Sequence, residues 1–267
     1  MADEYIASNK QLWDHWTRLH EKSEFYDLPG FKAGRDSLNP TEVAEVGDVA
    51  GKSLLHLQCH FGMDTLSWAR RGAKVTGADL STVAIQLARS LSAELGIEAS
   101  FVAANLYDLP AALQGQFDII YTGGGALWWL PDMARWGEVI AHFLKPGGIF
   151  YVRDQHPAAM AFEEVDGRLE PLYSYWERTE PLKFDTHGSY AAPDADHSFV
   201  EYGWIHSLGE IVNALTTQGL HIEFLHEWPH NFFQMFSSME RDEQRRWWLP
   251  DHGTSIPMSF SLRARRE

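Results

Sequence analysis

The sequence predicts an α/β fold built on one doubly wound, mostly parallel sheet of seven strands. Two observations lead to this prediction. Short apolar runs alternate with amphipathic stretches of helical length between residues 53 and 155, which is typical of parallel strands joined by crossover helices. A helix and two further strands follow between residues 207 and 265, with no clear crossover helix between the two strands. We therefore expect the C-terminal strand to be antiparallel.

The seven expected strands are short runs of aliphatic, β-branched and aromatic residues. They span residues 53–59, 73–79, 99–105, 117–123, 147–155, 220–228 and 255–265. The expected helices have apolar residues at helical spacing or clear start and stop signals. They span residues 9–22, 40–47, 64–72, 82–96, 132–144 and 207–219. The fourth of these helices has Ser81 or Thr82 as its cap and Gly96 as its stop.

Three segments lie outside this regular pattern. Residues 1–48 are expected to form an N-terminal helical cap on the main domain, residues 49–267. From about residue 157 to residue 203 the chain is polar, proline-bearing and aromatic, which indicates a lid insertion. Residues 229–253 are expected to form another loop over the mouth of a pocket.

Composition narrows the class of partner. The formal net charge of −15 would repel DNA or RNA, and no apolar run is long enough to cross a bilayer. The N-terminus has no signal-peptide core, and the single cysteine, Cys59, suits a reducing cytoplasm. Eleven tryptophans, many near expected loops, favour the walls of a small-molecule pocket. We therefore expect a cytoplasmic protein with a small-molecule partner, no nucleic acid and no membrane.

Four strand ends carry residues that suit a ligand. In an open parallel sheet, ligands bind beyond the carboxyl ends of the strands. The turn "QCHFG" follows the first expected strand, and Asp79 and Asn105 follow the second and third. The segment "TGGG" follows the fourth.

Each of these ends has a chemical use. Gly62 lets a ligand approach the backbone closely, and Asp79 can accept two hydrogen bonds from a ribose diol. The amide oxygen of Asn105 can accept from the exocyclic amine of an adenine, and Gly123 and Gly124 leave room for a reactive group. Each residue alone is more typical of a turn or a cap. Four in order along the chain favour one nucleotide-like cofactor.

These motifs resemble those of the class I S-adenosylmethionine-dependent methyltransferases. The five segments that carry the resemblance are "LLHLQCHFG", "VTGADLS", "FVAANLYDLP", "FDIIYTGGGALWWLPD" and "FLKPGGIFYV". The resemblance covers about residues 45–155 and is strongest to a bacterial subgroup that includes natural-product methyltransferases. It implies a Rossmann-like fold, S-adenosyl-L-methionine as cofactor, and methyl transfer to an amine or hydroxyl of a small metabolite.

The resemblance also implies which residues form the site. The implied cofactor-binding residues are Gln58, Cys59, His60, Gly62, Asp79, Leu80, Asn105, Leu106, Thr122 and Gly123. The expected acceptor-binding residues are Trp13, Phe25, Tyr26, Gly124 and Trp128. The chain departs from the family at His56, where an acidic residue is usual, and at Gln58 and His60, which replace turn glycines. Because the backbone supplies most contacts at this turn, we expect a working site, in which Cys59 is a packed residue rather than a nucleophile.

A hydroxyl acceptor usually needs a base, whereas an amine must be neutral when it attacks. The candidates for a base are His156, after the fifth expected strand, and His206, before the C-terminal helix. No metal site is expected. His226 and His230 are four residues apart, but Pro229 and the preceding strand argue against the helix that would bring them together.

Two other functions are compatible with parts of this pattern. A non-catalytic cofactor-binding protein on the same fold would explain the atypical turn. An NAD-dependent oxidoreductase would share the acid after the second strand, but the dinucleotide fingerprint is absent. The aromatic cap slightly favours nitrogen as the methylated atom. The insertion is as compatible with a homo-oligomer interface as with a lid.

Overall fold

The central sheet has seven strands, as predicted. The computed structural model describes residues 2–176, 179–196, 198–250 and 256–267. In order across the sheet the strands are β10 (Leu220–Trp228), β14 (Ser259–Arg266), β5 (Leu144–Gln155), β4 (Phe117–Thr122), β1 (Ser53–Leu57), β2 (Lys74–Asp79) and β3 (Ala99–Ala103). The C-terminal strand β14 is antiparallel to both β5 and β10, whereas β1 to β5 pair in parallel.

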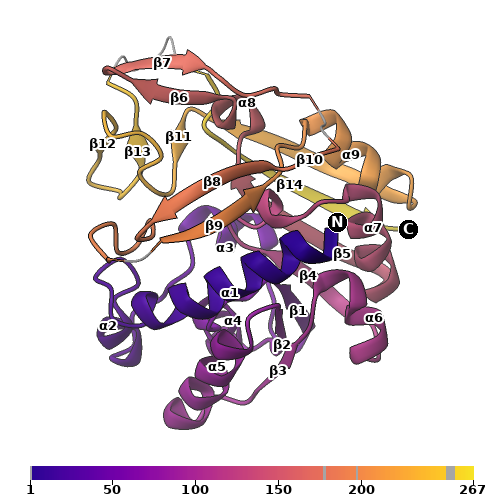
Figure 1. Cartoon of the computed structure of the whole chain (residues 1–267). Helices are drawn as coiled ribbons and strands as arrows, with labels where there is room; N and C mark the ends of the chain where they lie inside the picture. Colours follow the sequence, from indigo (N-terminus) through magenta and orange to yellow (C-terminus); the bar gives the residue numbers. More distant parts are fainter. Residues whose placement is uncertain (1, 177–178, 197, 251–255) are drawn as a thin grey trace.

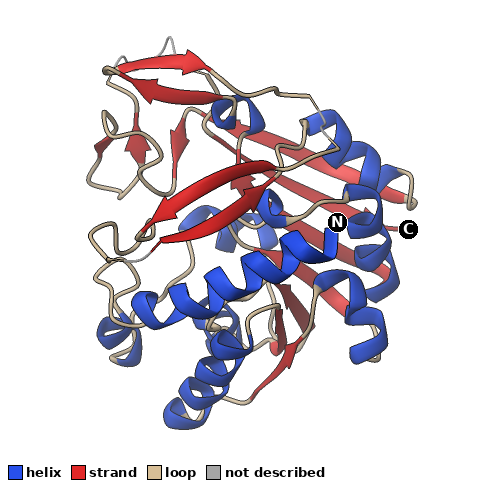
Figure 2. Ribbon diagram, viewed as in Figure 1, coloured by secondary structure: helices blue, strands red, loops and turns tan. Residues whose placement is uncertain are grey.

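Helices cover both faces of this sheet (Figure 2). Those of the N-terminal half are α1 (Ala2–His20), α2 (Leu28–Lys32), α3 (Pro40–Val46), α4 (Met63–Arg70) and α5 (Thr82–Leu95). Those that follow are η1 (Leu106–Asp108), α6 (Leu109–Ala112), η2 (Leu127–Trp129), α7 (Met133–Phe143), α8 (Pro157–Met160) and α9 (Leu208–Thr216). Ser81 caps α5 by accepting a hydrogen bond from the backbone of Ala84, and Gly96 ends it, as expected.

The buried residues explain why the sheet lies in the middle. Leu55 of β1 packs in a core cluster with residues of α7 and α9, among them Trp136. Leu54, one residue earlier, packs on the opposite face with Trp68 of α4 and Tyr121 of β4. Alternate side chains of a strand point to opposite faces, so a strand buried on both faces reads as a continuous apolar run.

Two segments expected as lid or loop contain small sheets. The insertion folds into two hairpins, β6 (Phe162–Val165) with β7 (Arg168–Pro171), and β8 (Leu182–His187) with β9 (Ser198–Gly203). The later segment contains β11 (His230–Asn231), β12 (Glu240–Arg241) and β13 (Trp247–Trp248). Two-residue strands show no periodicity along the chain, so sequence reasoning could not detect them.

Helix α1 begins at Ala2, seven residues before the expected start, and lies beside β9 (Figure 1). The amide of Asn9 fixes this arrangement. Its Nδ2 donates to the carbonyl of Tyr202 at 2.7 Å, and its Oδ1 accepts from the N–H of Tyr202 at 3.0 Å. The indole of Trp16 donates to the carbonyl of Gly188 at 2.8 Å. The N-terminal helix and the insertion are therefore held together by directed hydrogen bonds.

The turn-rich stretch after α1 contains one helix that sequence reasoning missed, α2. It is short, and the carboxylate of Asp27 accepts a hydrogen bond from the backbone of Gly30 at its start. Across the described residues, no helix combines the length and the apolar character that a membrane crossing needs.

Candidate functional site

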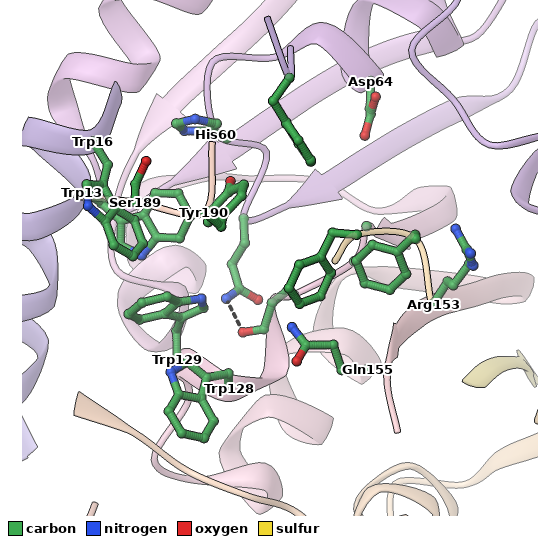
Figure 3. A pocket seen from close by; sticks show the side chains of 18 of the residues that line it. Trp13, Trp16, His60, Asp64, Trp128, Trp129, Arg153, Gln155, Ser189 and Tyr190 are labelled. Carbon is green, nitrogen blue, oxygen red and sulfur yellow. Dashed lines mark hydrogen bonds between the residues drawn. The ribbon is translucent and has the colours of Figure 1, made fainter. Parts of the chain in front are cut away.

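A cavity of about 1600 Å³ opens at the carboxyl ends of β1, β2, β4 and β5 (Figure 3). Pockets for one small molecule usually measure about 300–1,000 Å³. The cavity therefore has room for a cofactor and a second molecule. Its walls come from the strand ends, α1, the α2–α3 segment, the insertion and the segment around β11.

The turn after β1 keeps a glycine-type backbone although two of its residues are not glycine. Gln58 has φ +57°, His60 has φ +50° and Gly62 has φ +82°. The left-handed conformation costs roughly 1–2 kcal/mol for a residue with a Cβ atom. Contacts hold it in place, since Gln58 Nε2 donates to the Ala126 carbonyl at 2.8 Å and the Cys59 N–H donates to the Ala78 carbonyl at 2.9 Å.

Gly62 must be glycine because of its neighbours as well as its positive φ. A Cβ atom on Gly62 would lie 2.8 Å from the ring of Phe101 and 3.0 Å from Ala88. Helix α4 therefore begins in close contact with β3 and α5. This packing brings the turn to the end of β2.

Asp79, at the end of β2, lies directly against the turn. Its Oδ2 accepts a hydrogen bond from the His60 N–H at 2.7 Å, and its Oδ1 accepts one from the Ser81 N–H at 2.8 Å. Burial raises the pKa of Asp79 to about 6, although these backbone donors act in the opposite direction. A carboxylate has about four acceptor positions, so positions remain for a ligand diol.

His56 occupies the place in β1 where the related family has an acid. Its Nδ1 lies 2.8 Å from Thr65 Oγ1, and burial lowers its pKa to about 3, so the ring is neutral at pH 7. The negative charge that an acid would supply at this position of β1 is therefore absent at His56.

Asp64, in the first turn of α4, places a carboxyl group in the cavity instead (Figure 3). A Cβ atom built on Gly123 would lie 3.7 Å from Asp64 Oδ2 and 3.8 Å from His56 Nε2. Burial, reinforced by the nearby Glu42, raises the pKa of Asp64 to about 7. Sequence reasoning missed this residue because an acid in the first turn of a helix is commonplace.

Aromatic side chains cover the turn from the side of α1. The ring of Trp13 lies 5.2 Å from His60 and 5.1 Å from Trp129, measured between centroids. His20 Nδ1 lies 3.0 Å from His60 Nε2, and His20 Nε2 lies 3.1 Å from Ser189 Oγ. Burial lowers the pKa of both imidazoles, so both are neutral. One chain of hydrogen bonds thus joins the turn, α1 and the insertion.

Most of the residues singled out from the sequence line this one cavity. They are Trp13, Phe25, Tyr26, Gln58, Cys59, His60, Gly62, Asp79, Leu80, Asn105, Leu106, Gly123, Gly124 and Trp128. Cys59 is buried, and burial raises the pKa of its thiol.

Two of the expected cofactor-binding residues need a closer description, one for its placement and one for its hydrogen bond. Thr122 is fully buried outside the cavity lining, because strand alternation turns it to the face opposite Gly123. Asn105 lines the cavity, but its Oδ1 caps η1 by accepting from the Tyr107 N–H at 3.2 Å. Asn105 Oδ1 is the atom expected to accept a hydrogen bond from an adenine amine. One of its lone pairs is already used by the Tyr107 N–H.

The two histidines expected as bases lie outside the cavity lining. His156 caps α8, with Nδ1 accepting from the Ala158 N–H at 3.0 Å, and its Nε2 lies 2.8 Å from Glu227. His206 has Nε2 2.7 Å from the Leu130 carbonyl and Nδ1 3.0 Å from Glu210. Both ring nitrogens of each histidine are engaged internally, so neither is placed to take a proton from an acceptor in the cavity.

No group of three or more His, Cys, Asp or Glu side chains is arranged to hold a metal ion within the part of the chain that the structure describes. His226 and His230 lie on separate strands. His226 is hydrogen-bonded to Glu45 at 2.6 Å, away from the cavity lining.

Comparison with known proteins connects this geometry to one family. Residues 54–148 match the family model described as a methyltransferase domain. The chain is 30% identical over 197 residues to the ubiquinone biosynthesis O-methyltransferase of Bordetella pertussis. The aligned segment covers 69% of this chain and 76% of that relative. It is 31% identical over 148 residues to the protein of the same name from Xanthomonas euvesicatoria, and this alignment covers 54% of this chain. The chain spans 62% of the length of that relative.

Solved structures agree with the sequence relatives. An S-adenosylmethionine dependent methyltransferase from Mesorhizobium loti is 25% identical, with a TM-score of 0.62 and coverage of 88% of this chain and 100% of that one. The glycopeptide N-methyltransferase MtfA, solved with sinefungin, is 16% identical with a TM-score of 0.55, and covers 85% of each chain. At that identity the likeness concerns the fold.

Proposed function

Because this chain belongs to the family of S-adenosylmethionine-dependent methyltransferases, we propose that it transfers a methyl group to a hydroxyl of a small molecule. The observation that carries the proposal is the contact between His60 and Asp79 inside a cavity with room for two molecules. Hydroxyl is preferred to amine because curated relatives that share about 30% identity are named as O-methyltransferases.

The cofactor of this family is S-adenosylmethionine, and the residues present fit it. Residues 58–62 of the left-handed turn line the cavity, and Asp79 suits a ribose diol. Leu80 and Leu106 offer apolar surface for an adenine. When bound, the cofactor supplies a methyl group on a positively charged sulfur. Trp13 and Tyr26 line the cavity, and aromatic rings attract such a cation.

Removal of the acceptor proton falls to Asp64 in this proposal. A base works best when its pKa lies near the working pH, and the pKa of Asp64 is about 7. Its carboxyl lies beside Gly123, which follows β4, the strand next to β1. His156 and His206 give up this role because their nitrogens are engaged elsewhere.

The remaining expectations belong to the same proposal. Residues 1–48 and the insertion, about 157–203, act together as the cover that excludes water from the cavity, which the hydrogen bonds of Asn9 and Trp16 support. The protein works in the cytoplasm on a small molecule, without nucleic acid, which the net charge of −15 supports. A homo-oligomer is compatible with this scheme but is not part of it.

Two measurements test the proposal. Isothermal titration should detect binding of S-adenosylmethionine and S-adenosylhomocysteine. Labelled donor should then transfer its methyl group to at least one member of a panel of phenols, alcohols and amines. Cofactor binding without any transfer would favour the non-catalytic alternative. Absence of cofactor binding, with quenching of protein fluorescence by NADH, would favour the oxidoreductase.

A further inference from the structure

Arg153 is a buried cation in the wall of the cavity. It lies near the end of β5, and only 3% of its surface is exposed. Its Nε is fully buried without a hydrogen-bond partner. Across the described residues, no carboxylate lies within ion-pair distance of its guanidinium.

Two other arginines show the usual arrangement, with a carboxylate partner. Arg35 pairs with Asp27, and Arg246 pairs with Asp242. A charge removed from water without a counter-ion destabilises the folded protein. Asp64 lines the same cavity, but it forms no ion pair with Arg153 in the described part of the chain. The protein therefore presents Arg153 to a partner that is not part of its own fold.

Arg153 lies on the same side of the cavity as Asp64 (Figure 3). The ring of Phe232 lies 4.8 Å from Arg153 Cζ and also blocks the space at Gly124, where a Cβ atom would lie 2.4 Å from the ring. Gln155, two residues along β5, lines the cavity as well. Figure 3 shows Arg153 and Asp64 on one side of the cavity, and Trp13, Trp16, Trp128 and Trp129 gathered on the other.

The strand order separates Arg153 from the ribose site. β5 lies three strands from β2, which carries Asp79. Neighbouring strands are about 4.8 Å apart, so roughly 14 Å of sheet lies between the two residues. A molecule held at Arg153 would reach Gly123 and Asp64 from the side away from Asp79.

We infer that Arg153 binds an anionic group of the methyl acceptor, so that the substrate is a small acid, a carboxylate or a phosphate ester, with an apolar or aromatic body. This inference rests on the proposed function and names the substrate class. A planar guanidinium binds either group through two parallel hydrogen bonds. Phe232 supplies apolar surface beside it.

Titration of simple probes tests the inference. Benzoate, phenyl phosphate and neutral benzamide are titrated into the full-length protein with and without saturating S-adenosylhomocysteine. Benzoate or phenyl phosphate should bind at least tenfold more tightly than benzamide, and whichever binds better identifies the anion. Arg153→Met should lose at least tenfold of that affinity, and Arg153→Lys should lose less because the charge remains.

Arg135→Met is the matched control. Arg135 also lies over an aromatic ring, with Cζ 4.6 Å from the centroid of Tyr107, but it is outside the cavity lining. This variant should bind the anionic probes as the wild type does. Circular dichroism and thermal unfolding confirm that each variant folds.

Two results would overturn the inference. One is equal affinity for benzoate, phenyl phosphate and benzamide, or no effect of Arg153→Met. The other is a loss of S-adenosylhomocysteine affinity in Arg153→Met with unchanged binding of 5′-methylthioadenosine, which lacks the amino-acid part. Arg153 would then hold the cofactor carboxylate. Failure of the proposed function is a separate result. In that case the wild type binds neither S-adenosylmethionine nor S-adenosylhomocysteine, whatever the anion titrations without cofactor show.

Discussion

The backbone N–H of His60 lies 2.7 Å from Oδ2 of Asp79. One residue belongs to the turn after β1 and the other ends β2, so this hydrogen bond joins the two strand ends that a ribosyl cofactor would touch. His60 has a left-handed backbone at this contact. The turn thus keeps its shape without its usual glycines.

Replacement of Asp79 by Asn should weaken cofactor binding. The amide keeps the size of the side chain but loses the charge and one acceptor position for a ribose diol. A hydrogen bond to a charged group contributes about 1.5–3 kcal/mol, so the Kd for S-adenosylhomocysteine should rise by roughly tenfold or more in isothermal titration. Asp166→Asn, in the β6–β7 turn, is the control and should bind normally. An unchanged Kd in Asp79→Asn would remove Asp79 from the site.

Cofactor binding should release protons near pH 6. The pKa of Asp79 is raised to about 6, so much of this group is protonated below pH 6 in the free protein. Ribose hydroxyls donate to the ionised form and therefore lower the pKa on binding. Affinity should rise as the pH increases from 5 to 7. Titrations at pH 6 in two buffers with different ionisation enthalpies measure the released protons. Asp79→Asn should release fewer, and equal release would contradict the assignment.

Replacement of Asp64 by Asn should slow the chemical step. Loss of a general base costs on the order of 10²-fold or more in rate, while the affinity for S-adenosylhomocysteine should change little. The wild-type rate should fall as the pH drops below about 7, the pKa of Asp64. The variant should lose that limb of the pH–rate profile. Retention of the limb would show that another group takes the proton.

The same substitution should change stability with a defined sign. The folded-state pKa of Asp64 is about 7, above its ordinary value of 3.8. Its protonated form is favoured in the folded protein, so the stability it contributes is complete below about pH 4 and is lost as the pH rises through 7. Urea unfolding should therefore show Asp64→Asn gaining stability relative to the wild type between about pH 4 and pH 7. A constant difference over that range would exclude the raised pKa.

Replacement of Gly62 by Ala should destabilise the protein strongly. The left-handed backbone adds strain, and the new methyl group would press on Phe101 and Ala88. Strain and overpacking together should cost about 2–4 kcal/mol in urea unfolding. Gly115→Ala is the control, because Gly115 also has a positive φ but faces open space. It should cost about 1–2 kcal/mol, from the backbone strain alone. Equal costs would mean that the contact at Gly62 is not tight.

Replacement of Asn9 by Leu should loosen the insertion. Leucine has a similar size but makes neither of the two hydrogen bonds to Tyr202. Limited proteolysis should cut the β8–β9 hairpin faster than in the wild type, and S-adenosylhomocysteine should protect it less. Ser8→Ala removes one hydrogen bond, to Val200, and should have a smaller effect. Unchanged cleavage in Asn9→Leu would show that other contacts hold the insertion.

The sequence by itself determined the sheet and the place of the site. The strands from Ser53 to Gln155 and the turn at Gly62 follow from local apolar runs, caps and glycines, because such signals act over a few neighbouring residues. The family motifs identified Asp79 in the same way.

Only the tertiary structure decided which polar side chains face the cavity. Asp64 and Arg153 had no signal in the sequence, since a first-turn acid and a strand arginine are ordinary locally. His156 and His206 were misplaced in the cavity because their partners, Glu227 and Leu130, are more than 70 residues away. Burial and orientation depend on contacts between distant segments, and no pattern of neighbouring residues contains them.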